Sequence, residues 1–212
     1  HPVAGRHQPM SAMLGRFHEI SISTPDLAAS LSFYESLGYA RLETLAVWPH
    51  PHGVVSDGVV TLGSHEYRFP SPSITYVHDD IDAARTAFAS LGITFAFDIN
   101  TPGKFNEFGF RDPGGTMVTV LERETFHVVP ASRSSCGEFQ AFSLPSADLA
   151  HSRLFWSRLA VTPPRFDAAG LALAFHDARA DAAQMLLFRN AESARTFAAP
   201  EGTRLVSGSL ST

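Results

Sequence analysis

Imidazole and carboxylate groups are the side chains of this sequence that could do chemistry. The chain has 10 histidines. Three segments place them beside one another or beside a glutamate: His18-Glu19, Trp48-Pro49-His50-Pro51-His52 and His65-Glu66. Neutral imidazole and carboxylate oxygen are the usual protein ligands of iron, zinc, nickel and manganese, and both groups act as general acids and bases. Metal binding and proton transfer are therefore the two chemistries to weigh.

Other reactive groups and binding loops are sparse. Lys104 is the only lysine and sits in a Pro-Gly loop, which leaves an amine mechanism one weak candidate. No Gly-x-Ser-x-Gly turn is present, and the glycines within 109–115 close a hairpin, so they do not form a phosphate loop. Cys136 is the only cysteine, which excludes an intrachain disulfide and suits a reducing compartment. We therefore expect a cytoplasmic protein.

Composition limits the classes of partner. The 16 basic and 21 acidic residues give a formal net charge of -5, which does not favour nucleic acid. No stretch approaches the roughly 20 consecutive apolar residues of a membrane span, so we expect no membrane partner. The first 14 residues lack the apolar segment of a signal peptide and are expected to be a disordered leader or an expression remnant.

One order of elements recurs along the chain. Residues 17–23 alternate apolar and polar as in a half-buried strand, Thr24-Pro25-Asp26 offers helix capping, and a helical pattern ends at Leu37-Gly38. The same order returns over 74–92 and 139–160. Each helical pattern is followed by short apolar runs with tight turns, which predicts an α+β fold with a largely antiparallel sheet built from βαβββ modules.

These signals resemble a known superfamily. Pro25-Asp26-Leu27, Phe33-Tyr34 and Leu37-Gly38, followed by 108–115 with its Asp-Pro-Gly-Gly turn, resemble the vicinal-oxygen-chelate pattern of glyoxalases, bleomycin-resistance proteins and extradiol dioxygenases. The resemblance covers roughly residues 15–123 well and 137–190 more weakly. It implies that two modules pair edge to edge into a half-open barrel whose cup holds a ligand or a metal.

The domain organisation follows from the repeats. We expect a complete two-module domain at 15–123, with modules at about 15–70 and 71–123, and a linker at 124–136. A third module and the start of a truncated fourth are expected at 137–212, with 202–212 as the first strand of the fourth. A third module without a partner exposes a sheet edge, so a homodimer is the favoured assembly.

The resemblance also supplies a test for metal. Metal-dependent members carry His seven residues before the Asp at the helix start, and Glu seven residues after the Asp of the closing turn. Three of the four corresponding positions here are Glu19, Ser73 and Thr119. The remaining position falls near Leu62, where the closest donors are His65 and Glu66. The first-strand position of the third module is Ala141. The usual site is therefore expected to be missing from the first two modules, and no cofactor is favoured. The alternative is iron, zinc, nickel or manganese held by Glu19, His65 and Glu66, with His18 as a further donor.

Strand alternation assigns faces to the first strand. Ile20 and Ile22 are expected toward the helices, which leaves Glu19, Ser21 and Ser23 facing the cup. His18 is expected to pack or to lie at the rim, because it could join Glu19 in the cup only through a β-bulge. The prolines around His50 and His52 favour an exposed turn.

Aromatic residues predict the character of the ligand. Phenylalanines concentrate in the second module, and half of them are expected to line the cup with other side chains as a site for an apolar or aromatic molecule. The predicted ligand-binding residues are Trp48, His65, Tyr67, Ser73, Phe95, Phe105, Phe108, Phe110 and Thr119, with Glu19 as a general base or hydrogen-bond acceptor.

Three functions remain open. The favoured one is a metal-independent small-molecule binding protein of the bleomycin-resistance kind. The second is a metal-dependent lyase, isomerase or ring-cleaving dioxygenase that uses displaced ligands. The third is a degenerate module that serves only as an interaction scaffold.

Overall fold

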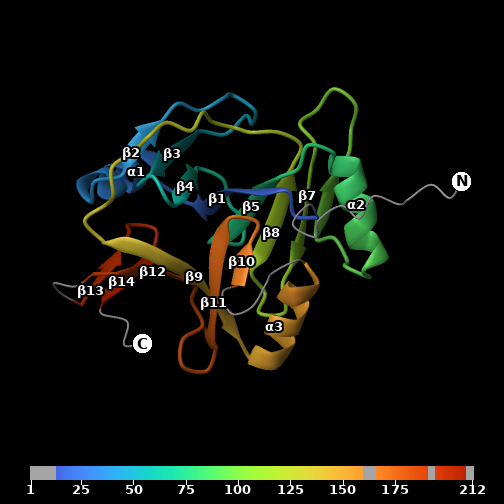
Figure 1. The fold of residues 1–212 in the computed structure, drawn as a ribbon. Helices are drawn as coiled ribbons and strands as arrows, with labels where there is room; N and C mark the ends of the chain where they lie inside the picture. The colour runs from blue at the N-terminus through green and yellow to red at the C-terminus, as the bar shows by residue number, and fades with distance from the viewer. Residues whose placement is uncertain (1–12, 160–165, 191–193, 209–212) are drawn as a thin grey trace, which may run out of the picture.

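The computed structural model describes residues 13–159, 166–190 and 194–208, and these form an α+β fold of two mixed sheets (Figure 1). Most of the expected leader, residues 1–12, lies outside the described residues, whereas Leu14 is buried in the core. No helix in the described ranges has the length and apolar character to cross a membrane.

The first sheet contains two βαβββ modules joined edge to edge. Its strands run in the order β2-β3-β4-β1-β5-β8-β7-β6. β1 pairs antiparallel with β5, while each of them pairs in parallel with the last strand of its own module, β4 or β8. The elements of these modules are β1 (Arg16–Ser23), α1 (Leu27–Ser36), β2 (Ala40–Leu42), β3 (His52–Ser56), β4 (Thr61–His65), β5 (Ser73–Val77), α2 (Ile81–Ser90), β6 (Phe97–Ile99), β7 (Glu107–Arg111) and β8 (Met117–Leu121).

The second sheet repeats this plan in reduced form. Its strand order is β10-β11-β9-β12-β14-β13, and the antiparallel pair of β9 and β12 takes the place that β1 and β5 hold in the first sheet. Between β12 and β13 the five residues 190–194 are too few for a helix like α1 or α2. The elements are β9 (Glu138–Ser146), α3 (Leu149–Arg158), β10 (Phe166–Ala168), β11 (Leu171–Asp177), β12 (Met185–Arg189), β13 (Arg195–Ala198) and β14 (Arg204–Gly208).

The C-terminal strands differ from the sequence expectation. The fourth repeat was expected to begin at 202, but β12 already pairs antiparallel with β9 and so starts that repeat. The expected first strand of that repeat, 202–212, instead supplies β14, which pairs in parallel with β12 as β8 does with β5. Residues 209–212 lie outside the described residues. The third module therefore pairs within the chain, which removes the reason given for a homodimer.

The expected linker 124–136 is packed rather than free. Phe126 is buried with Leu42 and Val54, and it stacks on His18 with ring centroids 4.0 Å apart. Cys136 is buried in the main core, and its carbonyl accepts a hydrogen bond from Ser207 Oγ at 2.7 Å. The segment thus covers the first module before it leads into β9.

Three aspartates begin the three helices in the same way. The side chains of Asp26, Asp80 and Asp148 each accept a hydrogen bond from the backbone N–H three residues later, at 2.9 to 3.0 Å. This is N-capping, which satisfies a backbone donor that the helix leaves free. The repeated cap sets the point at which each first strand turns into its helix.

One hydrophobic core joins the two sheets. Trp156 of α3 donates from its indole Nε1 to Asp112 Oδ2 at 3.1 Å, and Phe155 packs on Phe110 at 6.3 Å between ring centroids. Arg158 donates to the carbonyl of Leu91 at 3.1 Å, so α3 lies beside the C-terminal end of α2 (Figure 1). The second sheet is thereby fixed against the first.

Candidate functional site

A cavity of about 510 Å³ opens on one face of the first sheet. Gly53 of β3 faces α1, because a Cβ atom there would lie 2.6 Å from Leu31 Cδ1. Phe88 of α2 packs against Phe108 and Phe110 of β7. The cavity lies on the opposite face, where the alternate residues of β5, β7 and β8 point.

The apolar wall of the cavity is partly aromatic. Six apolar side chains from two loops and two strands of the first two modules contribute: Trp48, Phe69, Phe97, Ile99, Met117 and Leu121. Aromatic surfaces of this kind bind planar apolar groups well, and a volume of this size accommodates a drug-sized molecule.

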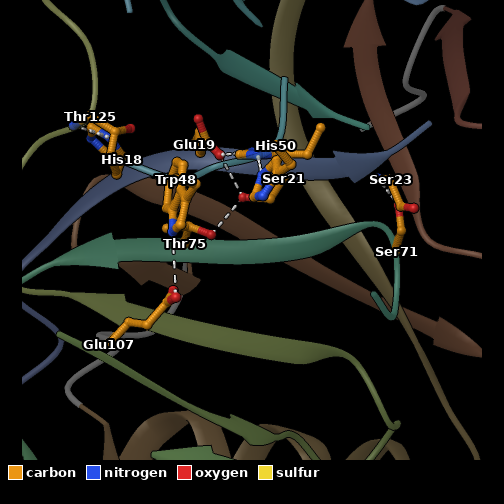
Figure 2. Close-up of polar contacts among 11 residues, drawn as sticks. His18, Glu19, Ser21, Ser23, Trp48, His50, Ser71, Thr75, Glu107 and Thr125 are labelled. Atoms are coloured by element: carbon orange, nitrogen blue, oxygen red, sulfur yellow. Dashed lines mark hydrogen bonds and ion pairs between the residues drawn. The ribbon is translucent and has the colours of Figure 1, made fainter. Parts of the chain in front are cut away.

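The polar wall is organised around the Glu19 carboxylate, which is 1% exposed. Its Oε1 accepts hydrogen bonds from Ser21 Oγ at 2.7 Å and from His65 Nε2 at 2.9 Å (Figure 2). Ser21 also contacts Thr75 Oγ1 at 2.6 Å across the β1–β5 pair. On the other side, His65 Nδ1 contacts His50 Nε2 at 3.1 Å. A buried carboxylate therefore ends two hydrogen-bond chains, whose outer members Thr75 and His50 line the cavity.

Three imidazoles gather beside this carboxylate. The rings of His52 and His65 stack at 5.6 Å between centroids, and His50 lies 5.4 Å from His65. His50 also stacks on Tyr67 at 5.0 Å. Nε2 of His52 is buried and has no hydrogen-bond partner among the described residues. The sequence treated His50 and His52 as an exposed turn, and this is wrong: His52 begins β3 and His50 lines the cavity.

Burial and neighbouring charges shift the pKa values around the cavity. Burial acts to raise the pKa of Glu19, but the hydrogen bond from His65 and the charges of its neighbours outweigh it, and the pKa is lowered. Burial lowers the pKa of His50 to about 4 and also lowers that of His52. For Glu107, which lines the cavity and accepts from Trp48 Nε1 at 3.4 Å, burial raises the pKa. His50 and His52 are therefore uncharged at neutral pH.

The register identifies the fourth position of the usual metal set. Ser21 pairs with Gly63 in the first module as Thr75 pairs with Thr119 in the second. Gly63 is thus the counterpart of Thr119, and it has no side chain to offer. A Cβ atom at Gly63 would lie 2.1 Å from Glu19 Oε2, so the Glu19 carboxylate fills the space that a donor at this position would need.

The donors present do not fit the metal that the resemblance implies. The four positions hold Glu19, Gly63, Ser73 and Thr119, and the single carboxylate is already engaged by Ser21 and His65. The displaced set is not assembled either, because the exposed Glu66 accepts from the backbone N–H of Leu27 at 3.2 Å, at the start of α1. Across residues 13–159, 166–190 and 194–208, no group of three or more His, Cys, Asp or Glu side chains could hold a metal ion.

The structure brings together about half of the residues predicted for the ligand site. Trp48, His65, Tyr67, Ser73 and Thr119 all line the cavity. Phe105 lies at its edge, 5.4 Å from Trp48 between ring centroids.

Three predicted phenylalanines face away from the cavity. Phe108 and Phe110 are fully buried under α2, because residues 107, 109 and 111 take the cavity face of β7. Phe95 packs on Phe108 at 4.8 Å on the same side. Phe97, which belongs to the same concentration of phenylalanines but was not among the predicted ligand-binding residues, lines the cavity instead. It lies over Gly109, where a Cβ would meet its ring at 2.3 Å.

His18 shows how a bulge overrides simple alternation. The pairing of β1 with β5 shifts register between Phe17 and Glu19. His18 consequently lies on the same face as Glu19, where Phe126 covers it and Thr125 Oγ1 contacts its Nε2 at 2.8 Å. It packs, as expected, and does not reach the cavity.

Among known proteins, only solved structures resemble this chain, and they show its fold. No protein-family model and no curated protein matches the sequence. Solved structures do match across most of the chain. A catechol 2,3-dioxygenase aligns with a TM-score of 0.58 and 12% identity over 92% of this chain and 88% of its own. Homoprotocatechuate 2,3-dioxygenase from Arthrobacter globiformis aligns with a TM-score of 0.60 and 16% identity, over 91% of this chain and 79% of its own. A Mn(II)-bound glyoxalase from Novosphingobium aromaticivorans aligns with a TM-score of 0.54 and 13% identity, over 92% of this chain and 82% of its own.

Proposed function

We propose that this chain, which has the vicinal-oxygen-chelate fold, is a small-molecule binding protein that holds a flat, apolar ligand in the cavity of its first sheet. The observation that carries the proposal is the cavity itself, about 510 Å³ with an aromatic and aliphatic wall facing a polar one. Such a combination fixes both the body and the orientation of a ligand.

The donor set supports a site without a metal in the usual positions. Ser73 and Thr119 are weak ligands, Gly63 is none, and Glu19 is held by neighbouring side chains. Ligand binding then depends on the side chains of the cavity wall.

The binding test uses a neutral aromatic probe, 4-ethylanisole, and amide NMR of the full chain. We expect saturable shifts that cluster on β5, β7 and β8 around Thr75, Glu107 and Thr119. Replacing Thr119 with Trp fills the cavity and is expected to weaken binding at least tenfold while the fold is kept. The groove at Leu91, Phe95 and Arg158 provides an internal control. Shifts confined to that groove, or none up to the solubility limit, would contradict the proposal.

A metal test separates this function from the metal-dependent alternative. Elemental analysis of the untagged full chain is expected to find less than one equivalent of iron, zinc, nickel or manganese. Stoichiometric metal that is lost in both Glu19→Ala and His65→Ala would overturn the proposal in favour of a metal-dependent enzyme.

Location and assembly remain proposals of the same kind. The single cysteine supports a cytoplasmic location. We also propose a homodimer, with sedimentation as its test. Since β9 has a partner strand on each side within the chain, a second copy would pair at an edge strand of the second sheet, β10 or β13.

A further inference from the structure

The two hydrogen-bond chains of the polar wall share one end point. Ser21 Oγ and His65 Nε2 both contact the same oxygen of Glu19, Oε1 (Figure 2 shows the Ser21 contact). The other oxygen, Oε2, is buried and has no hydrogen-bond partner among the described residues. An ionised carboxylate only accepts hydrogen bonds, so Glu19 fixes the direction of every proton in the two chains.

The hydroxyl chain has one consistent arrangement. Ser21 has a single hydroxyl proton, and it donates this proton in the hydrogen bond to Glu19 Oε1. The 2.6 Å contact between Ser21 and Thr75 must then use the proton of Thr75. Thr75 Oγ1 is left with lone pairs only, and Thr75 lines the cavity. The cavity end of this chain is an acceptor.

The imidazole chain gives the same result when both rings are neutral. His65 donates from Nε2 to Glu19, so its Nδ1 has a lone pair and accepts from His50 Nε2. The remaining nitrogen of His50, Nδ1, is then an acceptor as well. His50 lines the cavity, so both chains present acceptors to the ligand.

The surrounding charges act in the same direction. Glu107 on β7 is the other carboxylate at this wall, and Arg68, at the exposed rim, is the only arginine or lysine among the described residues that line the cavity. His52 and Tyr67, the remaining titratable neighbours of His50, bring no positive charge at neutral pH. A ligand carboxylate placed here would face lone pairs and negative charge.

We propose that Glu19 sets the hydrogen-bond polarity of the cavity, so that the site takes ligands with an O–H or N–H donor on a flat apolar body and rejects carboxylates. Glu19 is here a positioning residue that acts through Ser21, Thr75, His65 and His50. The inference rests on the proposed function and deepens it by naming the ligand class.

Three probes of one shape test the polarity. They are 4-ethylphenol, its methyl ether 4-ethylanisole and the 4-ethylbenzoate anion, titrated at pH 7.5 into the full chain and followed by amide NMR. A hydrogen bond contributes about 1 kcal/mol net, so we expect 4-ethylphenol to bind roughly fivefold or more tightly than the ether. The benzoate is expected to bind more weakly than either.

Two threonines provide a matched pair of variants. Thr75 and Thr119 are register partners on neighbouring strands and both line the cavity, but only Thr75 belongs to a chain that ends at Glu19. Thr75→Val is expected to bring the phenol-to-ether affinity ratio close to one. Thr119→Val is expected to change both affinities by a common factor and to leave their ratio as it is. Glu19→Met is expected to lower the ratio as Thr75→Val does, with folding checked by circular dichroism.

The outcomes separate the inference from the proposed function. If the ether binds as tightly as the phenol, if the benzoate binds best, or if Thr75→Val and Thr119→Val change the ratio equally, the polarity is wrong while ligand binding stands. If neither the phenol nor the ether binds in the cavity, the proposed function fails, and the inference fails with it.

Discussion

Glu19 and Gly63 act as one unit at the residue scale. The glycine leaves room for the carboxylate, and the carboxylate is held there by Ser21 and His65. Neither residue alone explains the arrangement, because any side chain at 63 would displace Glu19 from both hydrogen bonds.

Gly63→Ala is therefore expected to destabilise the protein although it adds only a methyl group. Its Cβ would lie 2.1 Å from Glu19 Oε2 and would push the carboxylate away from its donors. Loss of charged hydrogen bonds in a buried setting costs about 1.5–3 kcal/mol, measurable by urea unfolding. The double variant Gly63→Ala with Glu19→Ala is the control, since without the carboxylate the methyl group has space. Equal losses from Gly63→Ala in both backgrounds would contradict the arrangement.

Acid is expected to destabilise the fold through its buried histidines. Burial lowers the pKa of His18 below its usual 6.5, and the charge of Glu19 only partly opposes this. The unfolded chain consequently binds more protons than the folded one just below pH 6.5, so stability is complete above that pH and declines as the pH falls. We expect a lower urea midpoint at pH 5.5 than at 7.5.

His18→Gln removes one titrating ring from this balance. The amide can still contact Thr125, so the fold is expected to persist while the decline between pH 7.5 and 5.5 becomes smaller. An unchanged decline would assign the acid sensitivity to other groups, of which His50 and His52 also have lowered pKa values.

Sequence reasoning reached part of this site and missed part of it for a physical reason. Spacing from the helix caps pointed to Glu19 and Ser73, and spacing from the Asp112 turn pointed to Thr119. All three lie on the cavity side of the sheet, because each strand is directly connected to its cap or turn. His50 and Thr75 were missed as site residues, since their roles depend on contacts with His65 and Ser21 that lie far away along the chain. No local pattern encodes such contacts.

At the scale of elements, alternation along a strand decided which aromatic residues reach the cavity. In β7 the sequence Glu-Phe-Gly-Phe-Arg has its two phenylalanines on one face. That face packs on α2, so the concentration of phenylalanine marks the core, while Glu107 on the alternate face marks the site. Counting positions within the strand would have corrected the prediction.

The helix caps offer a second prediction at this scale. Asp80 accepts from Ala83 N at 2.9 Å, so Asp80→Ala is expected to cost roughly 1 kcal/mol of unfolding free energy. Asp80→Asn keeps a capping oxygen and is expected to be close to neutral. Urea unfolding of the two variants makes the comparison, and equal losses would mean that the carboxylate charge, rather than the cap, matters.

For the whole molecule, the repeats predicted the α+β class and the modules, and comparison with solved structures bears out the fold. The order of the C-terminal strands was not predictable in the same way. Only five residues, 190–194, separate β12 from β13, so the sequence of the fourth repeat lacks the strand–helix signal that identified the other repeats. Only the pairing of β12 with β9 reveals where that repeat begins.

Glu201 connects the two sheets and yields a prediction for the whole molecule. It lies between β13 and β14, yet it accepts hydrogen bonds from Ser30 Oγ and Tyr34 Oη of α1, both at 2.6 Å. Burial, with the Glu201 charge, raises the pKa of Tyr34 well above its usual value. Glu201→Ala is expected to cost about 1.5–3 kcal/mol, and Glu201→Gln less, because the amide oxygen still accepts.

Calorimetry checks this prediction. Because one core spans both sheets, the wild type and Glu201→Ala are each expected to unfold in a single transition, the variant at a lower temperature. Two resolved transitions in the wild type would show that the sheets are independent.

The position of Trp48 also gives the protein an optical property. Of the two tryptophans, Trp156 of α3 is fully buried in the core, whereas Trp48 lies at the cavity wall beside His50 and Glu107. An indole responds to polarity, so a molecule that displaces water from this wall shifts the emission of Trp48 and leaves that of Trp156 as an internal reference. The chain thus carries its own fluorescent reporter, and occupancy of the cavity can be read in unlabelled protein.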